Sequence, residues 1–238
     1  MIKRILPGTF LALAVVALPS HAGNLTLGPG LLQSEFRLLS EDLGAALSYK
    51  PLAPAEPLGV TGFDMGIEFS STQMANPLIY QSVTSTSSDS LPIVRAEIQK
   101  GLPLGIDLGV SFSSVPSTDI KLIGAEVRYA FLKGGVATPA VAMRVSYTAL
   151  QGVNSLDLDT TGVDLSISKG FAFFTPYAGV GNVWVTSTPH NGLLAKESFT
   201  ESKYFVGANM NLTFINIALE GDKTGDARTY SLKFGWRF

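Results

Sequence analysis

Apolar and polar residues alternate along most of the chain, and this pattern constrains the fold more than any other feature. One run places Leu104, Ile106, Leu108, Val110 and Phe112 at every second position, and six further runs between residues 63 and 238 show the same period. A period of two is typical of a β-strand with two different faces. The runs span about nine to fourteen residues, whereas strands of soluble sheets centre on about 5–6.

Strands of this length suit a bilayer, which a tilted strand crosses in about 9–11 residues. Charged residues make up only 15% of the chain, and the mean hydropathy is +0.28. A secreted β-sandwich or lipocalin-like barrel is the soluble alternative, but it would have shorter strands and more surface charge. No apolar run after residue 22 is long enough for a transmembrane helix. The sequence therefore predicts an all-β fold, a transmembrane antiparallel up-and-down β-barrel.

The first 22 residues have the pattern of a secretory signal peptide. Lys3 and Arg4 precede an apolar stretch, and Ser20 and Ala22 place small residues at the −3 and −1 positions of a cleavage site. We therefore divide the chain into a signal peptide (1–22), an N-terminal segment (23–41) that is a short helix or an extra strand, and a barrel (42–238).

Eleven strands can be counted in the sequence, an odd number, although bacterial single-chain barrels have even numbers of strands. We favour twelve strands, with one more before residue 42. Leu32, Phe36, Leu39 and Leu43 have helical spacing, so ten strands plus an N-terminal helix is the alternative. The eleven expected strands span residues 42–50, 59–71, 91–101, 103–115, 120–132, 138–150, 156–168, 171–186, 199–213, 215–222 and 227–238.

The connections fall into two sets. Tight turns carry Lys-Gly at residues 100–101, 133–134 and 169–170, whereas residues 70–90 form a long segment rich in Ser and Thr. Outer-membrane barrels have short periplasmic turns and longer extracellular loops. Aromatic residues are expected to form girdles at both membrane surfaces. One set is Phe131, Phe171, Phe173, Phe214, Trp236 and Phe238, and the other is Phe69, Phe112, Tyr147, Trp184 and Tyr204.

The chain ends in YSLKFGWRF, with Tyr230, Leu232, Phe234, Trp236 and Phe238 at alternate positions. This ending resembles the C-terminal signature of Gram-negative outer-membrane β-barrel proteins, a class that includes small porins and transporters. The resemblance implies that these five residues are read by the barrel-assembly machinery. It also implies export to the bacterial outer membrane and contact with its lipid and lipopolysaccharide. One departure is Lys233, where the fuller signal often has Gly. The sequence leaves the oligomeric state open.

The sequence predicts neither an enzyme nor a cofactor or metal site. Because the chain has no Cys, thiolate ligands and Cys nucleophiles are excluded, and the net charge of −2 gives no reason to expect nucleic acid. After the signal peptide the only histidine is His190, and neither a Ser two residues later nor a neighbouring Asp supports it in the way barrel lipases and proteases require. Asp157 and Asp159 are expected to be solvated carboxylates at the outer rim rather than a cation site.

Charged residues at polar strand positions are the candidate lining of the barrel interior. If they line a water-filled passage, the chain is a narrow pore or transporter for ions or small polar solutes, with a slight preference for cations. If they pair and fill the interior, it is a non-conducting structural barrel whose extracellular loops bind a partner. The candidates are Asp64, Glu68, Arg95, Glu97, Asp107, Glu126, Arg128, Arg144, Asp164, Glu220, Lys233 and Arg237.

Overall fold

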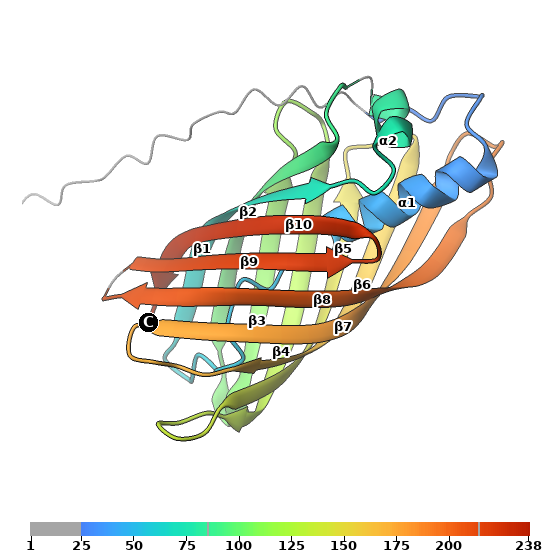
Figure 1. The fold of residues 1–238 in the computed structure, drawn as a ribbon. Coiled ribbons are helices and arrows are strands. Elements are labelled where there is room, and N and C mark those ends of the chain that lie inside the picture. Colours follow the sequence, from blue (N-terminus) through green and yellow to red (C-terminus); the bar gives the residue numbers. More distant parts are fainter. Residues whose placement is uncertain (1–24, 85, 214) are drawn as a thin grey trace, which may run out of the picture.

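Ten antiparallel strands close into one barrel in the computed structural model, which describes residues 25–84, 86–213 and 215–238 (Figure 1). Each strand pairs with its neighbours in sequence, and β1 pairs with β10 from Asp64↔Arg237 to Gln73↔Arg228 to close the ring. The expected signal peptide lies outside the described residues. The strands are β1 (Phe63–Gln73), β2 (Ser90–Gly101), β3 (Ile106–Ser114), β4 (Lys121–Lys133), β5 (Ala140–Gln151), β6 (Leu156–Ser168), β7 (Phe174–Pro189), β8 (Glu197–Leu212), β9 (Ile215–Thr224) and β10 (Ala227–Arg237).

The prediction of twelve strands is wrong, and its alternative of ten strands plus an N-terminal helix is confirmed. The stretch 42–50, expected as a strand, lies largely in helix α1 (Gln33–Leu47). Leu39, Leu43 and Leu47 recur every fourth residue and are buried together, which is a helical and not a strand period. The barrel consequently begins at Phe63 and not at residue 42.

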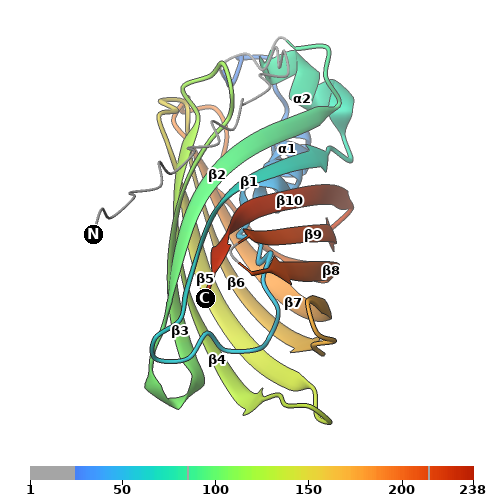
Figure 2. The same cartoon turned by 90° about the vertical axis from the view of Figure 1, so that its left-hand side faces the viewer.

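The two ends of the barrel differ in their connections (Figure 2). At one end, here called the loop end, residues 74–89 include helix α2 (Pro77–Thr84), and the β3–β4, β5–β6, β7–β8 and β9–β10 connections lie at the same end. The opposite end, called the turn end, holds the three Lys-Gly sites, the short 3-10 turn Pro103–Gly105 and the C-terminal Phe238. The chain therefore enters β1 and leaves β10 at the same end.

The outer wall carries an apolar belt, to which every strand contributes exposed large apolar side chains. Val110 and Tyr230, for example, are each 61% exposed. Toward the loop end the outward positions become polar, as at Ser114 and Thr200. A continuous exposed apolar belt flanked by polar residues is the form that a barrel wall takes in hydrocarbon. Within the described ranges no helix is long and apolar enough to cross a membrane.

Most of the expected aromatic girdle residues lie on the outer wall. Phe69 is half-buried, and Phe214 is outside the described residues. The exposed members are Phe131, Phe171, Phe173, Trp236 and Phe238 at the turn end and Phe112, Tyr147, Trp184 and Tyr204 toward the loop end.

The upper interior, toward the loop end, is an apolar core around α1. Phe36 and Leu39 of the helix are fully buried among inward apolar residues of the wall such as Leu122, Leu158 and Val185. The helix approaches β7 closely at Gly44, where an added Cβ would lie 2.6 Å from Val185 Cγ2. Inward positions near the loop end are therefore apolar, because they pack on a helix rather than on water.

Candidate functional site

The interior of the barrel is occupied by the chain's own N-terminal part. Residues 48–62, here called the plug segment, leave the end of α1 and run to the turn end, where β1 begins (Figure 2). Residues 48–55 are all buried. The described N-terminal residues are held at the loop end, because Thr26 N donates to Val83 O (2.9 Å) and Ser155 Oγ donates to Leu25 O (3.0 Å). The N-terminal part of the chain thus passes through the barrel from one end to the other.

Cations of the wall bind backbone carbonyls of the plug segment. Lys203 Nζ donates to Tyr49 O (2.6 Å), and Arg128 Nη1 donates to Pro54 O (2.7 Å). Arg95 Nη1 donates to the carbonyl oxygen of residue 50 (3.3 Å). These contacts satisfy carbonyls of a non-helical, non-sheet segment that would otherwise be buried without partners.

Carboxylates of the wall bind backbone N–H groups of the same segment. Glu220 Oε2 accepts from Leu52 N (3.2 Å), and Asp107 Oδ1 accepts from Leu58 N (3.1 Å). Close to the turn end, an added Cβ at Gly101 would overlap the carbonyl oxygen of Gly59. The wall therefore fits the plug segment in two ways. Its carboxylates accept from the segment's N–H groups, and the absence of a side chain at Gly101 leaves room for the carbonyl oxygen of Gly59.

Two plug side chains complete the contact. Tyr49 donates its hydroxyl to Glu97 Oε2 (2.8 Å), and Lys50 Nζ pairs with Asp222 Oδ1 (3.0 Å). Lys50 and Asp222 are each about 1% exposed as side chains. A buried cation supplied by the plug therefore neutralises a wall carboxylate, and loss of the segment would leave that carboxylate unpaired.

The twelve predicted lining residues all lie on the inner wall, where eleven are buried and Arg237 is half-buried. Most pair with one another rather than facing an open channel. The ion pairs are Arg128–Asp107 (2.7 Å), Arg144–Glu126 (2.7 Å), Lys233–Asp64 (2.8 Å), Arg237–Asp64 (3.2 Å), Arg95–Glu68 (3.3 Å), Lys203–Asp164 (3.7 Å) and Lys233–Glu97 (3.8 Å).

The sequence interpretation missed four residues of this network. Lys203 and Asp222 occupy inward positions of β8 and β9, so the period-two pattern could have identified them. Tyr49 and Lys50 belong to the plug segment, where no period indicates which side chains meet the wall. Both residues lie within 42–50, the range that the sequence predicts as a strand.

Part of the interior near the turn end is not filled. A polar cavity of about 380 Å³ lies there, and its lining includes Glu56 of the plug segment, Ser168 and Thr175. Deeper in the wall, Glu126 Oε1 and Arg144 Nη1 have no hydrogen-bond partner in the described protein. A cavity of this size has room for water molecules.

The rim of the loop end holds His190 in a structural contact. Its Nε2 lies 2.9 Å from Asp157 Oδ2, and its Nδ1 lies 3.1 Å from Asn154 O. Both ring nitrogens therefore lie within hydrogen-bonding distance of oxygen atoms of the β5–β6 connection and the start of β6. Asp159 lies 3.5 Å from the Tyr147 hydroxyl. Within the described ranges no group of three His, Cys, Asp or Glu side chains is arranged for a metal ion.

Asp42 links helix α1 to the loop that carries α2. Its two carboxylate oxygens accept from Ala75 N and Asn76 N, each at 2.8 Å. Burial raises the pKa of this carboxyl, although the two N–H donors act in the opposite direction. Nearby, Arg37 pairs with Glu41 (2.7 Å) and lies over the ring of Phe199 (3.9 Å to its centroid). The helix is therefore tied both to the α2 loop and to the start of β8.

Replacing Asp42 by Ala is expected to loosen the α2 loop, because two backbone N–H groups lose a charged acceptor at a cost of about 1–3 kcal/mol. Amide hydrogen exchange at Ala75 and Asn76 should become about tenfold faster or more. Glu41→Ala is the control, since it removes a half-exposed ion pair on the same helix and should leave these two amides unchanged. Equal exchange in Asp42→Ala and the unaltered protein would contradict the assignment.

Comparison with known proteins finds similar solved structures, all at low sequence identity. No protein-family model and no curated protein matches the chain. At the level of class, the chain resembles Gram-negative outer-membrane β-barrels.

The similar solved structures include the KdgM porin, with 10% identity over 73% of this chain and 99% of the porin, at a TM-score of 0.38. They also include Ail, the attachment invasion locus protein of Yersinia pestis, solved with the heparin analogue sucrose octasulfate (13% identity, 74% and 97% covered, TM-score 0.30). A third is the neisserial surface protein NspA (10% identity, 74% and 94% covered, TM-score 0.31).

Proposed function

We propose that this chain is an integral protein of the bacterial outer membrane, with the turn end in the periplasm and the loop end outside. The apolar belt supports the membrane placement, since its exposed aromatic and aliphatic side chains would be a liability in water. The C-terminal Phe238 at the turn end, with its alternating apolar residues on β10, supports the orientation.

Within that membrane the barrel is closed at rest, and it acts through its loop end as a structural or surface-binding protein. The observation that carries this proposal is the plug segment, whose backbone is bound by wall residues such as Arg128, Lys203 and Glu220. The apolar core around α1 closes the same interior at the loop end. An ion would have to break both layers to pass.

A narrow passage that opens when the plug segment moves is the second candidate function. The cavity of about 380 Å³ at the turn end and the buried wall charges favour it. Buried ion pairs contribute little net stability compared with apolar residues of similar size, so a wall that carries so many of them suits a second, hydrated state.

Conductance of the refolded full chain in a planar bilayer separates the two functions. We expect no discrete current steps at moderate voltage from protein whose band shifts on heating in gel electrophoresis, which reports a folded barrel. Regular steps from the unaltered chain would refute the closed barrel and establish the pore. Flotation of the same sample with lipid vesicles tests the membrane placement separately.

A further inference from the structure

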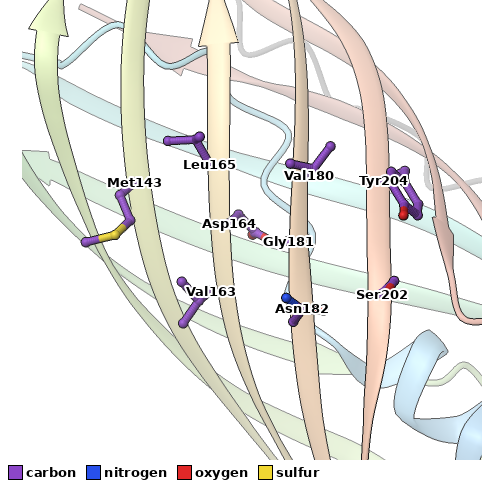
Figure 3. Close-up of a pocket in the computed structure, with 9 residues that line it drawn as sticks. All are labelled: Met143, Val163, Asp164, Leu165, Val180, Gly181, Asn182, Ser202 and Tyr204. Atoms are coloured by element: carbon purple, nitrogen blue, oxygen red, sulfur yellow. The ribbon is translucent and has the colours of Figure 1, made fainter.

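A hollow of about 580 Å³ lies on the outer wall across β5, β6, β7 and β8 (Figure 3). Two cross-strand rows form it. The row nearer the turn end is Leu165, Val180 and Tyr204, with Met143 beside it, and the row nearer the loop end is Val163, Asn182 and Ser202. Between the two rows the lining also includes the cross-strand pair Asp164 and Gly181.

The hollow lies across the edge of the apolar belt that is nearer the loop end. Toward the turn end the next outward residues are apolar, as at Val206, whereas toward the loop end the hydroxyls of Thr161 and Thr200 lie on either side of Trp184. Asn182 is exposed within this boundary, and its side-chain amide has no hydrogen bond to the described protein. An unpartnered amide at the edge of hydrocarbon is a donor and acceptor for a polar group that enters from the membrane.

Two cations lie directly beside the hollow. Lys223 on β9 is the cross-strand partner of Tyr204, and Arg228 on β10 is the partner of Lys223. Both side chains are exposed on the outer wall. Adjacent strands are about 4.8 Å apart, so these cations and the hollow form one continuous surface.

Only one of the two cations is balanced by a carboxylate of the protein. Like charges directly opposite each other in a sheet repel. Asp226 pairs with Lys223 (3.1 Å), and Arg228 has no ion pair within the described residues. A phosphate between Lys223 and Arg228 would relieve this repulsion with charge-assisted hydrogen bonds, for which a guanidinium is well suited.

We propose that this surface binds one phosphorylated glycolipid of the outer leaflet, an inference that rests on the membrane placement proposed above. An acyl chain fills the hollow along Met143, Leu165 and Val180. Asn182 bonds the amide or ester that joins the chain to the sugar. Lys223 and Arg228 bind a phosphate, and the hydroxyls toward the loop end face the sugar. The orientation proposed above favours a glycolipid, because the cations and the hydroxyls then lie at the outer surface.

Native mass spectrometry of delipidated protein in detergent tests this site, with lipid A, phosphatidylglycerol and phosphatidylcholine as separate probes. The unaltered chain is expected to retain one lipid A. Lys223→Gln with Arg228→Gln should weaken its apparent affinity at least tenfold. Val163→Trp, which fills the hollow without changing charge, should also weaken it. Lys121→Gln with Lys196→Gln is the control, because it removes the same charge from exposed positions elsewhere and should leave the affinity unchanged.

Each other outcome overturns the proposal. Equal retention of phosphatidylglycerol with the same dependence on Lys223 and Arg228 would mean a general anionic-lipid site rather than a glycolipid site. An equal loss of lipid A affinity in the control variant would mean that binding depends on the total charge of the protein and not on this site. Unchanged retention in all variants would mean no site on this wall. Vesicle flotation separates these results from a failure of the membrane placement, and the heat shift in gels confirms that each variant is folded.

Discussion

Deletion of residues 25–61 is expected to convert a silent barrel into a conducting one. The deletion removes α1 and nearly all of the plug segment, which together occupy the interior, and it leaves a wall lined by ionisable side chains. Planar-bilayer recordings should change from no steps to discrete steps. The opened pore should prefer cations slightly, because the predicted lining has seven acids to five bases, and Asp222 and Lys203 add one of each.

Restoring the segment provides the control. A synthetic peptide of residues 25–61, added while the deleted chain refolds, should abolish the steps, and a peptide of the same composition in scrambled order should not. The heat shift in gels and the strand signal in circular dichroism identify preparations that have folded. A folded deletion variant that stays silent would show that the wall closes the interior by itself, and the plug segment would then not be the barrier.

Arg128→Met is expected to be the most destabilising single substitution in the interior. The Arg128 side chain is fully buried, its Nε and Nη2 bind Asp107 Oδ2 at 3.0 and 2.7 Å, and its Nη1 holds Pro54 O. Removing one partner of a buried pair leaves an uncompensated charge and costs about 3–5 kcal/mol. Urea unfolding of the refolded protein in detergent measures this loss.

Two further variants make the interpretation specific. Adding Asp107→Leu to Arg128→Met should recover part of the loss, because a buried pair replaced by apolar residues no longer leaves a lone charge. Arg228→Met, at an exposed outer position, should change the free energy of unfolding by no more than about 0.5 kcal/mol. A loss below about 1 kcal/mol for Arg128→Met would mean that water reaches Asp107 and that the middle of the interior is open.

The strands could be predicted because each has one face toward the membrane and one toward the interior. Residues 103–115 and 120–132, for example, were expected as strands and contain β3 and nearly all of β4. The helix was harder to place because α1 is enclosed by the barrel. A helix with several buried sides loses the clear polar face by which a surface helix is identified. Residues 42–47 of α1 are all buried, so this half of the helix has no polar face.

The filled interior could not be predicted from strand patterns. Alternation correctly places Arg128 and Glu126 on the inner face, but it does not say what they face. The contacts that decide this join Tyr49 to Glu97 and Lys50 to Asp222, residues far apart in the chain. The assembly-signal role of the last strand and the expected contacts with lipopolysaccharide and the assembly machinery stay predictions.

The path of residues 25–62 through the ring also sets an order for folding. The segment enters at the loop end and leaves at the turn end, while β1 and β10 form the seam between the first and last strands. A ring that had already closed could admit this segment only by drawing a chain end through a passage of paired charges. The segment must therefore lie in place while the seam between β1 and β10 is still open, and the strands close around it afterwards.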